Sequence, residues 1–484
     1  MVNAQCSTAT VEWTRWAQEE LGGVDLGDAR RSRRAVLILS RFMGAPESSI
    51  PRATENWAGA KAAYRYFDNE TVKPETIYEQ HRQAVIRRAQ GEPVVLAIGD
   101  TTQLDYTNNV STSGLGPLGD EEHHGLLVQP TLAVTPQRVA LGLIGQHIWT
   151  RDLETFRQSE AKGAKDRPIS EKESVKWLES FEASERFQKD LGESTKVVAV
   201  FDREGDVYEV FQRAGQPGTK SGLLVRSSYD RRVDDDEKKR LRDLMASQPV
   251  SGTLTIVVPR KLAKKSRDAH LEIRFAKVTL RPPTYRRLED RSQVSIHCVS
   301  AVEVDPPEGI EPLSWMLFTT EDVTSFQEAC EIIQWYTCRW IVELFFKTLK
   351  SGCQCEKRQL ETAERLKRCL VFDCIVAWRI LYLTTKGREV PHLPCTVVFE
   401  EEEWKGAWAF VHRSTKLPQE APALQEMVRL VGRLGGHLGR KRDKEPGSMT
   451  LWRGLQRLPD LGGMWLLFNG NAGQEDFALD TAED

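Results

Sequence analysis

Apolar and polar residues recur with a helical period in residues 334–351. An apolar stripe is formed by Trp335, Cys338, Val342, Phe345 and Leu349. Beside it, at about 3.6 residues per turn, runs a polar stripe of Tyr336, Arg339, Glu343, Lys347 and Lys350. The pattern predicts one helix that carries its charges at the edge of a cleft, next to a buried seam. Taken alone, the charged row is more typical of an ion-pair ladder on a solvated helix face.

Unbroken apolar runs predict the strands of a central sheet. Residues 94–98 form a run of the kind found in strands that are covered on both faces. A helix is expected near residues 171–191, with Ser170 and Glu173 as its capping box. Further strands are predicted at residues 126–134, 139–148, 196–201 and 223–226.

Two aspartates follow strands of this sheet. Asp100 comes after the run at residues 94–98, where it is either a turn residue or a metal ligand. Asp202 ends the strand at residues 196–201, and the commonest role of such a residue is to cap the next helix. Two aspartates at strand ends and a glutamate on a late helix are, however, the means by which an RNase-H-like sheet gathers carboxylates at one edge. Phosphodiester chemistry on two metal ions uses such a set.

Three motifs, in chain order, resemble those of the insertion-sequence-four family of DDE transposases. They are Asp100-Thr101-Thr102, Asp202-Arg203-Glu204, and the spacing Tyr336-x2-Arg339-x3-Glu343-x6-Lys350. The resemblance spans nearly the whole chain. It implies an α/β fold: an RNase-H-like mixed-sheet catalytic core with a β-rich insert, flanked by an α-helical N-terminal DNA-binding domain and an α-helical C-terminal region.

The resemblance also implies a catalytic triad. Its members would be Asp100, Asp202 and Glu343, which would serve as the metal ligands as well. They would hold two Mg²⁺ ions, for which Mn²⁺ could substitute. One ion would activate water or a 3′ hydroxyl and the other would stabilise the leaving oxygen, so no covalent enzyme intermediate is expected.

Contacts between the core and DNA are implied by the same resemblance. Trp315 would accept a base that is flipped out of the duplex, although the residue by itself is equally expected in a buried core. Arginine is suited to bidentate phosphate contacts. Phosphates near the cleaved end would be held by Tyr336, Arg339 and Lys350, with Arg226 and Lys347 as auxiliary contacts.

The N-terminal part of the chain predicts short helices with a cluster of arginines. Asp28 is the expected N-cap of a helix that starts with this cluster. Cations at a helix start oppose the helix dipole, so the cluster indicates contact with phosphates or base edges; a solvated cationic turn is the alternative. A second helix is expected at residues 56–67, and the two resemble the family's DNA-binding domain. The arginines are Arg30, Arg31, Arg33 and Arg34.

The insert between the strands and the glutamate helix is expected to be rich in β-structure. Alternating patterns predict strands at residues 253–258 and 272–278. The basic loop between them, which includes residues 260–267, either contacts the DNA backbone or forms a solvated hairpin tip.

Helices dominate the expected structure after the glutamate. Residues 362–386 predict an amphipathic helix that packs on the core, and residues 387–420, with several prolines and an acidic run, predict a connector. Later helices are expected at residues 423–433 and 450–458, and the acidic end from residue 470 onward is expected to be disordered.

These patterns divide the chain into five segments. The expected segments are a helical DNA-binding domain at residues 1–85, the first part of the catalytic core at 86–229, the β-rich insert at 230–320, the second part of the core with the glutamate helix at 321–386, and a helical dimerisation region with an acidic tail at 387–484.

The composition limits which partners the protein can bind and in which cellular compartment it is expected. The net charge of the 484 residues is −3, so binding to nucleic acid must use local basic patches. The start has no apolar signal region, and no run approaches the roughly 18 apolar residues of a membrane span. Nine thinly spread cysteines indicate reduced thiols. We expect a bacterial cytoplasmic protein, associated with the nucleoid and not with a membrane.

Together these observations predict a cut-and-paste DNA transposase. It would bind double-stranded DNA at transposon ends, cleave it by Mg²⁺-dependent hydrolysis and hairpin formation, and join the 3′ ends to target DNA as a homodimer in a synaptic complex. Two alternatives share the fold: a metal-dependent structure-specific nuclease, and a catalytically inactive DNA-binding inhibitor of transposition. A hydrolase of other substrates fits less well, because the cations near Glu343 suit phosphates rather than sugars.

Overall fold

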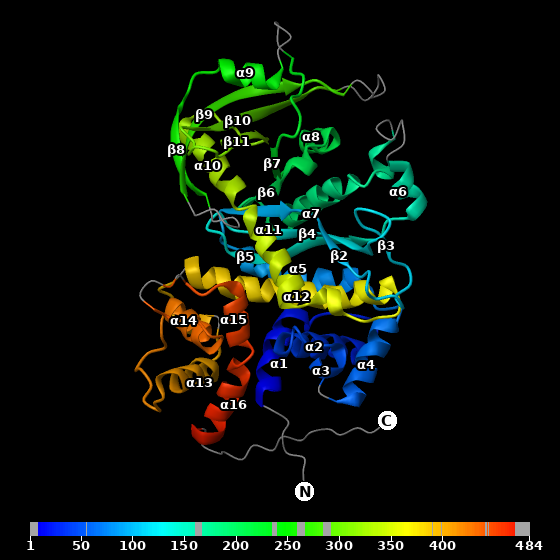
Figure 1. Ribbon diagram of the computed structural model, residues 1–484, viewed down its shortest axis with the longest axis vertical. Helices are drawn as coiled ribbons and strands as arrows, with labels where there is room; N and C mark the ends of the chain where they lie inside the picture. The colour runs from blue at the N-terminus through cyan, green and yellow to red at the C-terminus, as the bar shows by residue number, and fades with distance from the viewer. Residues whose placement is uncertain are drawn as a thin grey trace.

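The computed structural model joins the strands of the chain into one mixed sheet, with helical regions from both ends of the chain packed below it (Figure 1). It describes residues 8–54, 56–159, 167–234, 240–258, 267–283, 292–389, 391–397, 399–440, 443 and 445–469. Within these residues the sheet has 11 strands in the order β2-β4-β1-β6-β7-β11-β10-β9-β8, with β3 and β5 also paired to β4. The strands are β1 Val94–Gly99, β2 Thr102–Asp105, β3 Gly116–Pro117, β4 His124–Val134, β5 Ala140–Trp149, β6 Lys196–Phe201, β7 Gly222–Arg226, β8 Gly252–Val258, β9 Arg267–Leu280, β10 Val294–Val304 and β11 Ser314–Thr319.

The first strands form the core that the sequence predicts. β4 runs antiparallel to β1 and β5, whereas β6 runs parallel to β1 and β7. This is an RNase-H-like arrangement, so the predicted fold class is confirmed. Ile98 pairs with Val200 in the register of β1 and β6. Because parallel strands end at the same edge, Asp100 and Asp202, two positions further on, leave the sheet side by side.

The β-rich insert extends this sheet instead of forming a separate one. β11 pairs antiparallel with β7, where Leu317 faces Arg226, and β10, β9 and β8 follow outward. The strands predicted at residues 253–258 and 272–278 lie within β8 and β9. Of the predicted basic loop at residues 260–267, only Arg267 lies in the described part, where it pairs with Glu303 of β10.

The longest of the described helices, α12, lies between the sheet and the two helical ends of the chain (Figure 1). It contacts β5, the N-terminal helix α2 and the C-terminal helix α14. Nearly all of its side chains between Arg368 and Thr385 are buried, so the helix predicted at residues 362–386 exists but is covered on most faces instead of being amphipathic. The core helices are α6 Leu153–Ser159, α7 Val175–Leu191, α8 Tyr208–Ala214, α9 Leu241–Ser247, α10 Phe326–Thr337, α11 Trp340–Lys347 and α12 Ala363–Glu389.

The helix around Glu343 is broken, so the prediction of one continuous helix is wrong in this respect. α10 ends at Thr337, α11 begins at Trp340, and the residues Thr348–Gly352 form a π-helix. Cys338 and Arg339 keep right-handed helical backbone angles, so the period of the side chains persists across the break. The predicted apolar seam is accordingly buried along its whole length.

α7 starts later than predicted. Residues Ile169–Glu171 form a 3₁₀ turn, and α7 begins only at Val175. The predicted capping box with Ser170 does not form, since the carboxylate of Glu173 binds Arg151 at 2.7 and 2.8 Å.

The N-terminal helices dock on the core through a buried ion pair. Arg358, 3% exposed, binds Asp373 of α12 at 2.6 Å and donates to the backbone carbonyls of Pro46 and Ser48 in the loop after α2. A buried ion pair of this kind holds only when further hydrogen bonds complete it, as they do here. The N-terminal helices are α1 Thr8–Leu21, α2 Ala29–Gly44, α3 Ile50–Ala53, α4 Trp57–Asp68 and α5 Pro74–Ala89.

The C-terminal region contains a helix that the sequence analysis missed. The connector expected at residues 387–420 includes α13, Glu401–His412, which begins with a capping box of Glu400 and Glu403. The acidic run is therefore a helix N-terminus, where carboxylates are favourable. The helices expected at residues 423–433 and 450–458 correspond to α14, Leu424–Leu434, and α15, Ser448–Leu455, and are followed by α16, Leu458–Asn469.

The predicted acidic tail beyond residue 469 lies outside the described residues. Among the residues that are described, no helix has the length and hydropathy needed to cross a lipid bilayer.

Candidate active site

Asp100 and Asp202 lie beside each other where β1 and β6 end. Asp100 accepts a hydrogen bond from the backbone N–H of Thr101 at 2.8 Å, and Asp202 accepts one from that of Glu204 at 2.8 Å. Burial and the negative charge of Asp202 raise the pKa of Asp100 to about 6, although Arg339 opposes the shift. The two carboxylates are thus close enough to repel each other, as their positions at neighbouring strand ends predict.

Arg339 joins Asp100 to Glu343. It lies at the break between α10 and α11, and its guanidinium donates to Asp100 Oδ2 at 2.9 Å and to Glu343 Oε1 at 3.0 Å. The Arg339 and Asp100 side chains are only 13% and 19% exposed, whereas Glu343 is 44% exposed. The structure therefore brings Glu343 to the sheet edge that carries the aspartates, by way of an arginine.

Tyr336, Arg226 and Trp315 form the wall beside Arg339. Tyr336 is buried, and its ring meets the indole of Trp315 edge-on with centroids 5.4 Å apart. Burial raises the pKa of Tyr336, whose hydroxyl shares a hydrogen bond with Arg226. Trp315 is 8% exposed, so in this structure its indole packs as a core residue. To stack on a flipped base it would first have to be uncovered.

The two lysines of the predicted polar stripe have different surroundings. Lys347, exposed at the end of α11, forms no ion pair with the residues described. Lys350 lies in the π-helix, 3.8 Å from Glu356, and Glu356 accepts a hydrogen bond from the backbone of Asp105 in β2. The ion-pair ladder considered from the sequence thus forms at its first step, from Arg339 to Glu343, and stops there.

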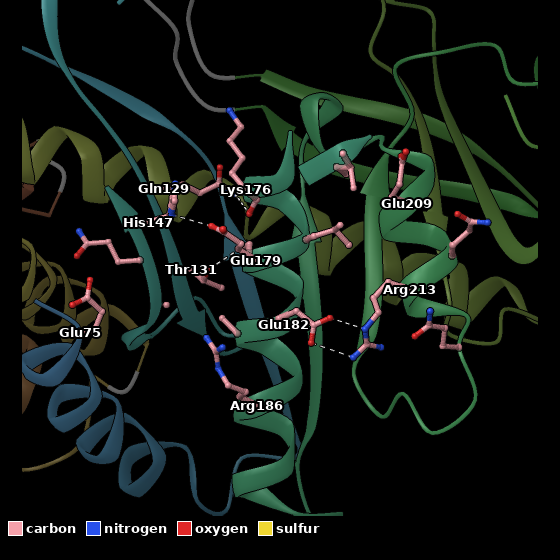
Figure 2. Close-up of a pocket in the computed structure, with 18 residues that line it drawn as sticks. Glu75, Gln129, Thr131, His147, Lys176, Glu179, Glu182, Arg186, Glu209 and Arg213 are labelled. Carbon is pink, nitrogen blue, oxygen red and sulfur yellow. Dashed lines mark hydrogen bonds and ion pairs between the residues drawn. The ribbon is translucent and has the colours of Figure 1, made fainter. Parts of the chain in front are cut away.

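Sequence reasoning missed two side chains, Gln129 and Lys176, that connect the two aspartate loops. The hydroxyl of Thr101 donates to Gln129 Oε1 at 2.8 Å. The amide of Gln129 donates to the backbone carbonyl of Lys176 at 3.2 Å (Figure 2). Lys176, whose side chain is 8% exposed, places Nζ 3.4 Å from Glu204 Oε2. The available signals were a glutamine in an otherwise apolar strand and a glutamate two positions after Asp202.

The carboxylates at this edge suit a divalent cation. Mg²⁺ prefers carboxylate oxygens, and a cation would offset the repulsion between Asp100 and Asp202. In this structure the guanidinium of Arg339 supplies the positive charge. Among the described residues no three Asp, Glu, His or Cys side chains lie close enough to hold one ion. The donor set therefore fits Mg²⁺ chemically, but the three predicted ligands are not gathered around one point.

A cationic groove lies in the N-terminal domain between α2 and α4. Asp28 caps α2, as predicted, by accepting from the backbone N–H groups of Arg30 and Arg31. The guanidinium of Arg31 also donates to the Leu26 carbonyl at 3.0 Å and the Thr71 hydroxyl at 2.5 Å, so part of its role is structural. The groove has a volume of about 520 Å³, and its cationic lining consists of Arg30, Arg31, Arg34, Lys61 and Arg65.

A cavity of about 770 Å³ between β5, α7 and α8 is separate from these sites except at Gln129 and Lys176 (Figure 2). Several of its charged groups bind one another: Arg213 donates to Glu182 at 2.6 Å, and His147 lies 2.9 Å from Glu179. Its walls carry four glutamates, which disfavour a nucleic-acid backbone. The candidate active site is therefore the edge where β1 and β6 end.

The RNase-H-like sheet, with acidic residues at its edge and a cationic helical domain before it, is the architecture of proteins that process nucleic acids. Family models match three parts of the chain. Residues 14–72 match Transposase DNA-binding, residues 223–378 match Transposase DDE domain, and residues 375–461 match Transposase Tn5 dimerisation domain. The chain is a DDE transposase that resembles the transposase of transposon Tn5, and the insertion-sequence-four family fits these matches.

The extents of the matches bear on the site. The DDE match includes Glu343 but begins after Asp100 and Asp202, so the two aspartates rest on their place in the fold. Among solved structures, the chain is similar to one described as the cryo-EM structure of the piggyBac transposase synaptic complex with hairpin DNA, with 9% identity, 98% of this chain and 76% of that chain covered, and a TM-score of 0.35. A similarity at this level does not bear on individual residues.

Proposed function

We propose that this DNA transposase cuts and joins DNA at the edge formed by Asp100, Asp202 and Glu343. Two Mg²⁺ ions, when bound there, would activate the attacking water or 3′ hydroxyl and stabilise the leaving oxygen. The observation that most supports the proposal is the pair of contacts from Arg339 to Asp100 and Glu343, at 2.9 and 3.0 Å. Through these contacts Arg339 joins Asp100, in the first part of the core, to Glu343, in the second part.

The protein's own side chains would divide the remaining work. The carboxylates would hold the metal ions, which Mn²⁺ could replace. Arginine binds phosphate in a bidentate manner, and the partly buried Arg339 and Arg226 would orient the phosphate that is cut. The proposed phosphate contacts are Tyr336, Arg339, Lys350, Arg226 and Lys347, of which Lys347 lies on the exposed face of α11.

The proposed reaction is first-strand cleavage, hairpin formation, release of the element and joining of its 3′ ends to target DNA. A hairpin at the end of a duplex is too tight for every base to stay stacked, and flipping a base out costs a few kcal/mol. Trp315, which borders Tyr336, would stack on that base once its indole is uncovered.

Recognition and pairing of the ends would use the two helical regions. The cationic groove between α2 and α4 would bind the transposon ends. Leu467 and Phe468 of α16 are 74% and 79% exposed, and this apolar surface suits the pairing of two copies in a synaptic complex. The expected place of action is the bacterial cytoplasm, on nucleoid DNA.

One assay tests the proposal against its alternatives. The protein is incubated with DNA that carries the two ends of its own element, with Mg²⁺ or Mn²⁺, and the products are separated. Excision with hairpin intermediates and joined 3′ ends is the expected result. Cleavage without joining would indicate a structure-specific nuclease, and binding without cleavage would indicate an inhibitor.

A further inference from the structure

Both oxygens of Asp100 accept hydrogen bonds from the protein. Oδ1 accepts from the backbone of Thr101 at 2.8 Å, and Oδ2 accepts from Arg339 at 2.9 Å. Glu343 Oε1 accepts from the same guanidinium at 3.0 Å. Mg²⁺ binds carboxylate oxygens at about 2.0–2.1 Å. A metal ion and the guanidinium therefore compete for the same side of these two carboxylates.

The helix that carries Glu343 is irregular at both of its ends. The turn at Cys338 and Arg339 separates α10 from α11, and α11 is a segment of 8 residues. It passes directly into the π-helix Thr348–Gly352. Such breaks and π-segments interrupt the helical hydrogen-bond ladder and often occur at functional sites. The short helix that carries Glu343 is thus bounded on both sides by interruptions of regular helix, and helices bend most sharply at such points.

We propose that Arg339 is a placeholder cation: without DNA it binds Asp100 and Glu343 in place of metal, and it frees them when a DNA phosphate takes the guanidinium. The inference rests on the proposed function, in which these two carboxylates are metal ligands. Metal binding is then gated by DNA, which keeps the nuclease centre incomplete until an end is in place.

The exchange is chemically balanced. Arg339 gives up two carboxylate partners and gains a phosphate, which it binds in a bidentate manner, while the carboxylates gain the metal. Each ligand then favours the other, and by linkage the effect is reciprocal. Couplings between two sites in one protein typically change affinity by about 5- to 150-fold.

The test measures binding of Mn²⁺ to the full-length protein, with free Mn²⁺ followed by electron paramagnetic resonance. Each variant is titrated alone and with saturating duplex that ends at the 3′ hydroxyl of the element, so that no bond remains to be cut. For the wild type, DNA should lower the Kd for Mn²⁺ at least about 10-fold. Arg339→Gln should bind Mn²⁺ more tightly without DNA, and its ratio of the two Kd values should fall at least about 5-fold below that of the wild type.

Two further variants complete the design. Arg339→Lys keeps the charge but cannot bridge both carboxylates as a planar fork does, so its ratio should be intermediate. Arg213→Gln breaks another arginine–carboxylate contact, to Glu182 at 2.6 Å, away from the sheet edge, and should behave like the wild type. Circular dichroism confirms that each variant keeps the wild-type fold.

The outcomes separate the inference from the proposed function. If Arg339→Gln keeps the wild-type ratio, the placeholder role is overturned, because any gain in affinity then reflects only the loss of a nearby positive charge. Asp100→Asn serves as the reference for the metal ligands. If it binds Mn²⁺ like the wild type with and without DNA, the assignment of the ligands fails as well. If it loses Mn²⁺ while Arg339→Gln keeps the wild-type ratio, only the role of Arg339 fails.

Discussion

Gln129 donates a hydrogen bond to the backbone carbonyl of Lys176 at 3.2 Å and so fixes the start of α7 against β4. Its carboxamide oxygen accepts from Thr101 at 2.8 Å, and Nζ of Lys176 lies 3.4 Å from Glu204. Thr101 and Glu204 each flank one of the two strand-end aspartates. Gln129 is 2% exposed, and a buried carboxamide with partners on both of its polar atoms holds them in place.

Replacing Gln129 by Leu should therefore weaken metal-dependent cleavage and leave binding of DNA ends intact. Leucine fills the space but removes a partner of the part-buried Thr101 hydroxyl and of the buried Lys176 carbonyl, and loosens the loops that carry the ligands. A buried polar group left unpaired costs about 1–3 kcal/mol. We expect the Mg²⁺ concentration for half-maximal nicking to rise about 10-fold or more. Gln212→Leu, which removes a hydrogen bond to Ser292 away from the sheet edge, is the matched control. An unchanged Mg²⁺ dependence would mean that the network is only structural.

The proposed triad is tested by removing one charge at a time. Asp100→Asn, Asp202→Asn and Glu343→Gln should each reduce cleavage about 10³-fold or more, since each removes a metal ligand. Binding of DNA ends should persist, because the N-terminal groove is distant from the sheet edge. Nicking of end-labelled DNA and a gel-shift assay measure the two properties. Glu182→Gln, which alters the carboxylate that binds Arg213 away from the sheet edge, is the control, and a triad variant that nicks at the wild-type rate would remove that residue from the assignment.

Local patterns predicted much of the fold. The run at residues 94–98 and the cap at Asp28 appear in the structure as β1 and α2, because burial on both faces and satisfaction of helix-end N–H groups are decided by nearby residues. The break before α11 escaped detection because Cys338 and Arg339 keep helical backbone angles, so the period of the side chains does not change there. α13 was taken for a connector because prolines lie on both sides of it and its acidic start resembles a solvated charge run.

Only those parts of the candidate site that follow from strand ends and residue spacing could be predicted. Parallel register places Asp100 beside Asp202, and a sequence can indicate that. The contact between Arg339 and Asp100 depends on how α11 packs against the sheet edge, and the Gln129 network depends on where α7 begins. Both are consequences of tertiary packing, which leaves no periodic signal in the chain.

The cationic groove predicts a salt-dependent interaction with DNA. The combined replacement of groove residues by Ala should weaken end binding and lower the slope of log K against log salt by about 0.9 per lost phosphate contact. Arg31 is left intact, because its contacts to Leu26 and Thr71 are structural. Arg33, outside the groove lining, and Arg52 are replaced separately, and we expect Arg52→Ala to match the wild type. The groove variant combines Arg30→Ala, Arg34→Ala, Lys61→Ala and Arg65→Ala.

Fluorescence anisotropy across a range of salt concentrations measures this slope. If the groove variant keeps the wild-type slope, its cations are solvated and do not meet phosphates. If Arg33→Ala alone reproduces the loss, the contact lies on the outer face of α2.

The proposed role of Trp315 is tested with a substitution suited to a buried position. Trp315→Ala would leave a cavity beside Tyr336, so Trp315→Phe is the better variant because it keeps an aromatic ring there. Stacking on a base contributes about 1–3 kcal/mol, so the smaller ring should slow hairpin formation about 10-fold while first-strand nicking stays near the wild-type rate. A time course that separates nicked, hairpin and blunt products measures both steps. Equal losses in nicking and hairpin formation would indicate a purely structural tryptophan.

His81 is neutral in the folded protein, according to its hydrogen bonds. Nε2 accepts from the backbone N–H of Leu143 at 3.0 Å, so the proton is on Nδ1, which faces Glu20. Burial lowers the pKa of His81 below the ordinary 6.5, although Glu20 opposes the shift. On its other oxygen Glu20 binds Arg88 at 2.9 Å, which links α1 to α5. Against the effect of burial, Arg88 and His81 hold the pKa of Glu20 below its ordinary value.

This arrangement predicts a loss of stability on acidification. As the pH falls through 6.5, His81 becomes protonated in the unfolded chain but stays neutral in the folded protein. The contribution of His81 to the free energy of unfolding is therefore complete above pH 6.5 and declines below it. Glu20, with its lowered pKa, adds a further loss below its ordinary 4.5. The effect of one such group is at most about 1.4 kcal/mol per pH unit.

Thermal unfolding at a series of pH values measures this loss. The Tm of the wild type should fall as the pH drops below 6.5, and His81→Gln, which cannot titrate, should flatten that part of the profile. His123→Gln is the control, because His123 is exposed and Asp120 raises its pKa. If His81→Gln follows the wild-type pH profile, the pKa of His81 does not differ between the folded and unfolded protein; a variant that loses stability more steeply than the wild type on acidification would mean that His81 is protonated in the fold and forms an ion pair with Glu20.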